Sequence, residues 1–412
     1  MGRVGIYGGT FNPPHLGHVS VARQAIDLLA LDSLLVIPAS VPPHKTLPED
    51  SPTTGQRLEL VRSAFADLPG LTVSDLELRR TGHSYTADTL HLLHQMYPED
   101  ELCLIMGTDM FLSFPHWYRP DAICQYASLA VFLRDVRDKD LQERIHATAQ
   151  EIEAKFAGKV ILVRNEILPV SSTDIRRMLT FGAGDCLMPE TVYRQIQALG
   201  LYGSAESCRN LSMDALEQKV IGLLNPKRVA HVLGCRDMAV KLAVHYGADQ
   251  TDAARAGLLH DVTKALSPSL QKLVCQAHGV PGSSYAHENG KTLHAFSGAL
   301  VARNIFGENE AVVRAIGSHT TGCAHMDTLQ KIIYIADYVE MNRNFPGVEE
   351  LRALAFCDLD RAMLAGLRMT VDLLVQQGRD ISIRSQQAIA WLEKQVCQQP
   401  QAAFKEGKMI PC

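Results

Sequence analysis

Short apolar runs alternate with segments of helical periodicity over roughly the first half of the chain. The apolar runs predict six buried strands, at 3–7, 33–40, 71–78, 101–107, 128–134 and 159–164. Between them, apolar residues recur at helical spacing and predict helices at 19–32, 55–66, 84–97 and 138–157. Strands that alternate with helices in this way predict an α/β domain with a doubly wound parallel sheet, which places ligands at the carboxyl ends of the strands.

The second half of the chain lacks strand-like runs. Apolar positions recur at helical spacing in five segments, at 236–247, 252–266, 297–307, 309–320 and 329–342. This pattern predicts an all-α domain. Ser, Gly and Asn cluster between the halves, so we expect one domain at 1–205, a linker at 206–213 and a second domain at 214–395. The remaining stretch, 396–412, shows no pattern, and we expect it to be a mobile tail.

Composition and charge narrow the function classes. The 412 residues are 46% hydrophobic and 21% charged with a formal net charge of −5, so we expect neither a nucleic-acid nor a membrane partner. No apolar run approaches the ~20 residues that cross a bilayer. No basic segment precedes the first strand, so we expect no signal peptide. The ten cysteines form no C-x-x-C pair, which favours free thiols and a cytoplasmic location.

The stretch GGTFNPPHLGH at 8–18 joins the first strand to the first helix. Such a turn directs backbone N–H groups at one point, which suits a phosphate, and Gly8 and Gly9 allow close approach. His15 and His18 lie on one face of the turn, where each can donate to a phosphoryl oxygen. The alternative is a pair of surface histidines beside a glycine turn. Because a strand and Gly-Gly-Thr precede them, the sequence favours a nucleotide site.

Further polar residues follow the other strands. His44 and Lys45 follow the second, Asp109 follows the fourth, and Arg134 ends the fifth. SSTDIRRM at 171–178 follows the sixth, where hydroxyls and Arg176 predict a second anion site, or alternatively only a helix capping box. The chain has neither a Walker A sequence nor a G-x-G-x-x-G fingerprint. We therefore expect ATP to be held across two phosphate cradles while a second phosphate attacks in line.

Five stretches in the first half are similar to bacterial nicotinate-nucleotide adenylyltransferases, which are HxGH nucleotidyltransferases. They are GGTFNPPHLGH, PPHK, SYTADTL, GTDMFLSFPHW and SSTDIRRM, and the resemblance spans 2–203. It implies a Rossmann-like domain that transfers adenylyl from ATP to nicotinate mononucleotide, with Mg²⁺, giving deamido-NAD and pyrophosphate. Only SYTADTL and GTDMFLSFPHW favour nicotinate, so a pantetheine-phosphate adenylyltransferase or a cytidylyltransferase stays as the alternative.

The resemblance also implies residue roles. His15 and His18 would contact the ATP phosphates, while Lys45 and Arg134 would neutralise phosphate charge. Thr86 would hydrogen-bond the nicotinate and Trp117 would stack on it, unless Trp117 is only a structural aromatic. The remaining ATP-binding candidates are Gly8, Gly9, Thr10, Gly107, Asp109, Ser172, Thr173 and Arg176. Asn12 departs from the family pattern, since many relatives carry Asp there.

Metal-ligand residue types recur along the helices of the second half. They are His231, His260, Asp261, His294, His319 and Asp337. His and Asp are ligands of Fe, Mn or Zn. Adjacent residues cannot share a helix face, so His260 can ligate one ion while Asp261 bridges to another. In a chain with sixteen histidines such a set could arise by chance, but the adjacent His-Asp pair favours a metal site.

The second half resembles the YqeK-type HD-domain family over 215–385, on HVLGCRDMAVKLA, AARAGLLHDVTKALS, LHAFSGALVARNIFG, IGSHTTG and KIIYIADYVEMNRNFPGVEELR. Those proteins are symmetrical bis(5′-nucleosyl)-tetraphosphate hydrolases. The resemblance implies an HD domain with two transition metals, iron first and manganese as the alternative, that converts diadenosine tetraphosphate into two ADP. His231, His260, Asp261 and Asp337 would hold one ion, and Asp261, His294 and His319 the other.

Lys264, Thr320 and Arg343 are the candidate phosphate contacts of this domain, or else ordinary residues of the helix surfaces. Cys323 stands where many relatives carry Arg, which puts one phosphate contact in doubt. The sequence thus predicts a bifunctional enzyme. The alternative is a catalytically silent HD domain that binds nucleotides and regulates the first domain. A homo-oligomer is left open.

Overall fold

The computed structural model describes residues 2–41, 47–48, 51–80, 82–133, 138–166, 168–204, 207–285 and 291–398. The chain divides into two compact units. The first, the α/β unit, comprises Met1–Thr180 and Gly184–Glu206, and the second, the helical unit, comprises Phe181–Ala183 and Ser207–Cys412.

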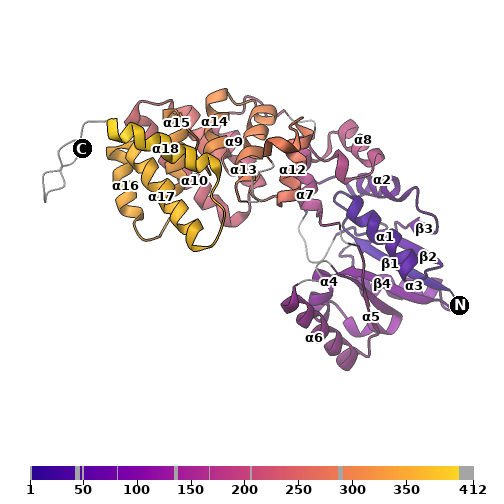
Figure 1. Cartoon of the computed structure of the whole chain (residues 1–412). Helices are drawn as coiled ribbons and strands as arrows, with labels where there is room; N and C mark the ends of the chain where they lie inside the picture. The colour runs from indigo at the N-terminus through magenta and orange to yellow at the C-terminus, as the bar shows by residue number, and fades with distance from the viewer. Residues whose placement is uncertain are drawn as a thin grey trace. The chain divides into compact units, whose positions relative to one another are not determined.

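The α/β unit is built on a six-stranded sheet of order β3-β2-β1-β4-β5-β6 in which every pairing is parallel (Figure 1). The strands are β1 (Arg3–Gly9), β2 (Ser33–Pro38), β3 (Leu71–Val73), β4 (Glu101–Gly107), β5 (Ala127–Phe132) and β6 (Val160–Val163). The central strands β1 and β4 are apolar apart from their first residues and Tyr7, as both faces of a parallel sheet are covered by helices. The predicted doubly wound α/β fold is confirmed.

Helices pack on both faces of this sheet. They are α1 (Leu16–Leu28), α2 (Thr54–Phe65), α3 (Thr86–Met96), α4 (Thr108–Ser113), α5 (Pro120–Tyr126), α6 (Lys139–Phe156), α7 (Ser172–Thr180) and α8 (Glu190–Leu199), with short 3₁₀ turns η1 (Phe114–His116), η2 (Asp185–Leu187) and η3 (Leu201–Gly203). One core cluster joins the sheet to α3, α5 and α6, for example through Leu90, Ile123 and Ile152, all fully buried. This packing fixes the sheet and hence the loops at the strand ends.

Strand order decides where a ligand can bind. β1 pairs with β2 on one side and β4 on the other. Successive strands are therefore added toward one edge of the sheet from β1 to β3 and toward the other edge from β4 to β6. At such a switch point the loops after the two strands diverge and leave a crevice at the carboxyl ends. The glycine turn after β1 and Asp109, which follows β4, therefore face the same crevice.

Two sequence predictions in this unit were wrong in detail. The third strand ends at Val73 and does not continue to residue 78, because the backbone of Leu78 bonds back to Asp75 in a turn. The segment between the fourth and fifth strands contains α4 and α5, which the sequence analysis did not predict. Lys45 and Arg134, together with His44, lie outside the described residues.

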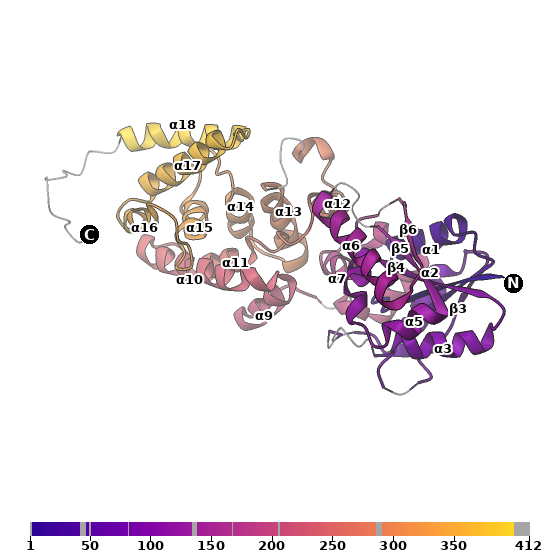
Figure 2. The ribbon, with the colours of Figure 1, turned by 90° about the horizontal axis from the view of Figure 1, so that it is seen from below.

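The helical unit is built from α-helices together with short 3₁₀ and π-helical segments (Figure 2). They are α9 (Met213–Leu223), α10 (Val229–Tyr246), α11 (Gln250–Leu259), α12 (Pro268–Ala277), α13 (Leu293–Val301), α14 (Glu310–Ser318), α15 (Thr328–Val339), α16 (Val348–Cys357), α17 (Leu359–Gln376) and α18 (Ile383–Gln398), with η4 (Pro226–Arg228), η5 (Gly282–Tyr285) and the π-helical η6 (Ala302–Phe306). No helix in the described part of the chain is long and apolar enough to span a membrane.

Helices α10, α11, α14 and α15 pack on one another and form the centre of this unit. The most buried of them, α15, places Ile332, Ile333 and Ile335 in the core with no exposure. Its start is set by a capping box in which Asp327 and Gln330 exchange hydrogen bonds. Five of the six predicted metal ligands lie on these helices or directly after them, and the sixth, His294, lies on α13, which packs against α14. Core packing therefore determines the ligand positions.

Candidate functional site

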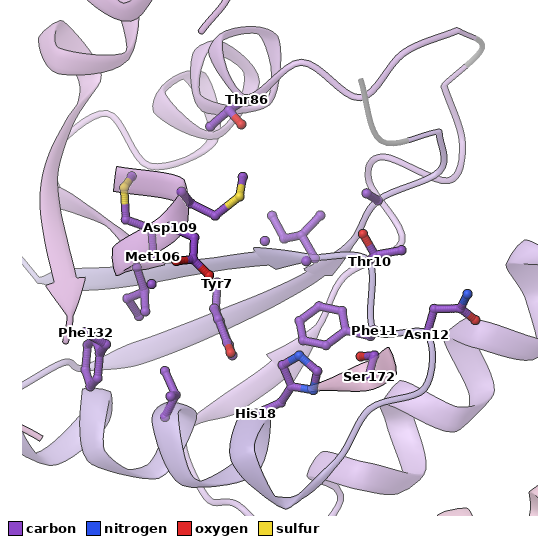
Figure 3. Close-up of a pocket in the computed structure, with 18 of the residues that line it drawn as sticks. Tyr7, Thr10, Phe11, Asn12, His18, Thr86, Met106, Asp109, Phe132 and Ser172 are labelled. Atoms are coloured by element: carbon purple, nitrogen blue, oxygen red, sulfur yellow. The ribbon is translucent and has the colours of Figure 1, made fainter. Parts of the chain in front are cut away.

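A cavity of about 500 Å³ lies at the carboxyl ends of β1 and β4 (Figure 3). His18, Thr10 and Ser172 lie toward one end of the cavity, and Asp109 and Thr86 toward the other. All the predicted residues of the first half that belong to the described part of the chain line it: Gly8, Gly9, Thr10, His15, His18, Thr86, Gly107, Asp109, Trp117, Ser172, Thr173 and Arg176.

His15 and His18 lie at the start of α1, where His15 is the N-cap residue. The backbone N–H of His15 donates to Nδ1 of His18 at 3.2 Å. Nδ1 therefore has no proton, and the neutral ring of His18 carries its proton on Nε2. The two rings pack against each other with centroids 3.7 Å apart and planes tilted by 31°. The loop thus holds His18 as an Nε2–H donor.

The glycines of this stretch differ in what a side chain at each position would contact. A Cβ at Gly8 would meet nothing within 4 Å, which leaves the backbone open for a ligand. A Cβ at Gly9 would come within 2.9 Å of the ring of Phe11, and one at Gly17 within 2.9 Å of Nδ1 of His15. Gly8 therefore leaves room for a ligand to approach the backbone, as expected for both glycines. Gly9 instead makes room for the ring of Phe11.

A buried arginine forms hydrogen bonds to the backbone of the loops after β1 and β2. Arg57, on α2, is 1% exposed and donates to the carbonyl oxygens of Thr10 at 2.9 Å, Ala39 at 2.9 Å and Ser40 at 3.1 Å. Burial lowers the pKa of its guanidinium. The sequence analysis missed this residue, because an arginine in a helical pattern is normally assigned to the surface.

Asn12 joins three parts of the α/β unit. Its Oδ1 atom accepts from the hydroxyl of Tyr202 at 2.8 Å, and its Nδ2 atom donates to Oγ of Ser51 at 2.8 Å. Its backbone carbonyl accepts from Arg176 at 2.7 Å. Because an amide is both donor and acceptor, the Asn12 side chain hydrogen-bonds one hydroxyl through each of its two polar atoms. The bond from Arg176 to its carbonyl links α7 to the loop after β1.

The start of α7 combines the two alternatives raised by SSTDIRRM. Ser171 and Asp174 form the capping box, with the side chain of each accepting the other's backbone N–H at 3.1–3.2 Å. Ser172 donates to the carbonyl of Pro13 at 3.0 Å, and Thr173 accepts from Arg176 at 3.1 Å. Ser171 both caps the helix and lines the cavity, beside Ser172 and Thr173, and the helix start is tied to the loop after β1.

The other end of the cavity is more apolar. Trp117 lines it half-buried, and its indole N–H donates to Ser113 at 3.1 Å. Tyr85 and Tyr118, which the sequence analysis missed, also line the cavity and pack with ring centroids 4.5 Å apart. Aromatic surfaces here suit a flat ring.

Glu77 is a further cavity residue that the sequence analysis missed. It is 8% exposed and accepts from the hydroxyl of Thr89 at 2.8 Å. Burial raises the pKa of this carboxyl, against the hydrogen bonds of Thr89 and Ser84 that lower it. In the sequence Glu77 lies within the segment predicted as the third strand, so it was not recognised as a residue of a ligand-binding loop.

In the helical unit the six predicted metal-ligand residues converge. His231 comes from α10, His260 and Asp261 follow α11, His294 is on α13, His319 follows α14 and Asp337 is on α15. Ligand atoms of His231, His260 and Asp337 lie within 4.8 Å of one another, as do those of His260, Asp261 and His319. The Nε2 atom of His294 is 3.1 Å from Asp261 Oδ1 and 3.1 Å from His319 Nε2.

The histidine rings are oriented for ligation through Nε2. The Nδ1 atoms of His260 and His319 each contact a backbone carbonyl oxygen at 2.7 Å, that of Gly257 and that of Ile316. A carbonyl only accepts, so Nδ1 carries the proton and Nε2 the lone pair. The buried Nε2 atoms of His231 and His260 find no hydrogen-bond partner in the described part of the chain. Orphaned nitrogen atoms beside carboxylates fit a metal ion.

Burial sets the protonation states at this cluster. It lowers the pKa of His260 and of His294 to about 4. Burial alone would raise the pKa of Asp261, but His260, His294 and His319 hold it well below its usual range. Neutral imidazoles and an ionised carboxylate are the ligand forms that a metal requires.

Cationic side chains surround the cluster. Lys264 Nζ lies 3.0 Å from Nε2 of His294, and Arg343 pairs with Asp337 at 2.8 Å. Arg228, which the sequence analysis did not name, pairs with Asp261. Thr320 is half-buried directly after His319, and Cys323 accepts from Gln330 at 3.6 Å. The cluster can thus offer both metal ligands and positive charge to a phosphate.

Comparison with known proteins matches this division. Residues 6–178 match the cytidylyltransferase-like family model, and residues 228–342 match the HD domain model. A probable nicotinate-nucleotide adenylyltransferase of Aeromonas salmonicida is 38% identical over 208 residues, covering 48% of this chain and 96% of the relative. One of Pseudomonas syringae is 36% identical over 209 residues, covering 48% and 93%. A solved structure titled a predicted HD superfamily hydrolase involved in NAD metabolism, from Clostridium acetobutylicum, is 35% identical, with a TM-score of 0.43, and covers 45% of this chain and 98% of that one.

The parallel sheet and the cavity at its switch point define the first unit as a cytidylyltransferase-like nucleotidyltransferase domain. The relatives specify the family further: the chain belongs to the nicotinate-nucleotide adenylyltransferase family, and its second half carries an HD domain. The resemblance of the first half is confirmed, and so is the expected HD domain.

Proposed function

We propose that the α/β unit transfers the adenylyl group of ATP to nicotinate mononucleotide. The observation that carries this proposal is the single cavity shared by the glycine turn, the start of α7, Asp109 and Trp117. The relatives' name supports the same reaction. A phosphate oxygen of the mononucleotide forms a bond to the α-phosphorus of ATP while the bond to the β-phosphate breaks. Deamido-NAD and pyrophosphate result.

The reaction needs positioning and charge neutralisation rather than a protein nucleophile. The Nε2–H of His18 donates to a phosphoryl oxygen, with the ring of His15 packed against that of His18. Thr173 and Arg176 take the far phosphates of ATP, which enters as its Mg²⁺ complex. Asp109 accepts from a ribose hydroxyl, while Thr86 and Trp117 meet the nicotinate. Lys45 and Arg134 remain proposed phosphate contacts.

The test is product analysis of the full-length protein with ATP and, in turn, nicotinate mononucleotide, nicotinamide mononucleotide and pantetheine phosphate. Deamido-NAD formed at least roughly tenfold faster than the other products supports the proposal. Preferred transfer to pantetheine phosphate, or incorporation from CTP in place of ATP, contradicts it and favours the alternative transferases.

We propose that the helical unit hydrolyses diadenosine tetraphosphate to two ADP. The observation that carries this second proposal is the convergence of the six ligand residues from five parts of the fold. His231, His260, Asp261 and Asp337 would hold one transition-metal ion, and Asp261, His294 and His319 a second. Two such ions, iron or manganese, would neutralise polyphosphate charge and lower the pKa of an attacking water.

The chain's own residues then bind and orient the tetraphosphate. Lys264, Thr320 and Arg343 are the proposed phosphate contacts, beside the ionised carboxylates of Asp261 and Asp337. Water adds to one of the two central phosphorus atoms, the bridging oxygen leaves with the other ADP, and a proton is released. No side-chain nucleophile is required.

The test combines elemental analysis of the purified full-length protein with measurement of ADP release from diadenosine tetraphosphate. Close to two transition-metal ions per chain together with ADP as the product support the proposal. Bound metal without turnover would instead favour a silent HD domain that binds nucleotides. An active preparation that holds no transition metal contradicts the metal centre.

A further inference from the structure

His231 differs from His260 and His319 in the partner of its Nδ1 atom. The latter two contact backbone carbonyls, whereas Nδ1 of His231 lies 3.1 Å from Oε1 of Glu340. Glu340 is 1% exposed and follows directly after α15. A carboxylate that is buried to this extent requires partners that donate hydrogen bonds. The partners of Glu340 therefore show what its side chain does.

In the described part of the chain, the hydrogen-bonding contacts of this carboxylate are with groups that can donate. Oε1 faces His231, and Oε2 accepts from the backbone N–H of Asn342 at 2.6 Å and from its side-chain amide at 2.8 Å. Because both oxygens of Glu340 are acceptors, Nδ1 of His231 must carry the proton. Its Nε2 atom then presents a lone pair 3.1 Å from Oδ1 of Asp337.

We infer that Glu340 is a positioning residue, which fixes the tautomer and orientation of His231 toward a divalent transition metal. This inference rests on the proposed metal centre. A glutamine cannot replace it, since an amide has one acceptor oxygen and one NH₂ group. If the oxygen faced Asn342, the NH₂ would face His231 and force the proton onto Nε2. If the oxygen faced His231, the NH₂ would oppose the two donors of Asn342.

Gly234 makes room for this carboxylate. It lies on α10, one turn after His231, and an added Cβ would collide with Oε2 of Glu340 and come within 2.9 Å of Nδ2 of Asn342. Glycine is otherwise unfavourable inside a helix. Its presence here has a steric reason that involves the same hydrogen bonds, so Gly234 provides an independent way to displace Glu340 without changing its chemistry.

The experiment is a titration of the chelator-stripped full-length protein with Mn²⁺, with the free ion counted by electron paramagnetic resonance. We compare wild type, Glu340→Gln and Gly234→Ala. The matched control is Gly222→Ala, a glycine inside α9 whose added Cβ would meet nothing within 4 Å. All titrations are made where circular dichroism shows each variant as helical as wild type.

Second-sphere partners typically contribute roughly 10- to 100-fold to metal affinity. We expect a weakening of that order for one Mn²⁺ in both Glu340→Gln and Gly234→Ala, and none in Gly222→Ala. Wild-type affinity in Glu340→Gln would overturn the inference, because glutamine preserves the packing and removes only the second acceptor. No Mn²⁺ binding by wild type would instead contradict the proposed metal centre itself.

Discussion

The two candidate sites differ in what the chain supplies. At the end lined by Thr10, His18 and Ser172, the nucleotide cavity presents backbone and side-chain donors: the glycine turn, the start of α7 and a histidine ring oriented by the main-chain N–H of His15. The metal cluster is built from buried side chains whose charges depend on one another, as with Asp261 and His260. The first is an open site prepared for an anion. The second is a set of mutually dependent ligands prepared for a cation.

This difference predicts how each site responds to the loss of one side chain. In the cavity, donors act in parallel, so each loss should reduce turnover and leave the others in place. In the cluster, a carboxylate at the centre of several contacts cannot be removed without leaving its partners unpaired. The experiments below test that contrast, beginning with the largest expected effect.

Asp261→Ala should abolish hydrolysis of diadenosine tetraphosphate and release both metal ions, because Asp261 contacts the ligand atoms of His231, His260, His294 and His319. Adenylyl transfer should be unchanged. Metal content by elemental analysis and ADP release measure the effect. Asp372→Ala, an exposed aspartate of α17, is the control. Retention of two ions by Asp261→Ala would remove this residue from the centre.

His18→Ala should lower kcat of adenylyl transfer roughly 10²- to 10³-fold, the usual cost of losing one donor aimed at transition-state charge. KM should change much less, and hydrolysis should be unaffected. Steady-state kinetics of both reactions on the same preparation measure this. His94→Ala removes an exposed histidine of α3 and serves as the control. Unaltered turnover would exclude His18 from the mechanism.

His294→Ala should lose chiefly one of the two ions, since its Nε2 contacts Asp261 and His319, whereas His231 groups with His260 and Asp337. Elemental analysis should find about one ion per chain, and ADP release should fall further than the metal content does. Loss of both ions would show that the cluster behaves as one indivisible unit, and the assignment of separate ligand sets would be wrong.

Trp117→Ala should raise KM for nicotinate mononucleotide about tenfold and KM for ATP much less, if the indole stacks on the pyridine ring. The chain's other tryptophan, Trp391, packs against His325 in the helical unit, and Trp391→Ala is the matched control. Equal losses for both substrates together with a lower thermal midpoint would mean that Trp117 is structural.

Arg57→Lys should lower the free energy of unfolding of the α/β unit by about 1–3 kcal/mol, the cost of leaving buried polar groups unsatisfied. A lysine cannot reach three carbonyl oxygens in the fork geometry of Arg57. Urea denaturation measures the effect. Arg62→Lys, on the exposed face of the same helix, should change stability by much less.

Residue patterns by themselves determined much of this protein. Apolar runs and helical spacing are local, so the strand–helix alternation and the all-α second half could be read from sequence. The glycine turn of 8–18 and the adjacent His260 and Asp261 carry their chemistry within a few residues. The third strand was overestimated for the same local reason. Apolar residues recur as far as Leu78, while the backbone turns back at Asp75.

Only the tertiary structure determined the hydrogen-bond partners of the site residues, and hence which of their atoms face the cavity or the metal cluster. Glu340 meets His231 across 109 positions of sequence, and Arg57 reaches Thr10 across 47. Nothing in the local pattern distinguishes either side chain from a surface charge. Hydrogen bonds to buried groups depend on distance and direction in space, which packing sets only once the helices and the sheet are assembled. The sequence therefore indicated which residue types could act as ligands, and the fold determined their tautomers and hydrogen-bond partners.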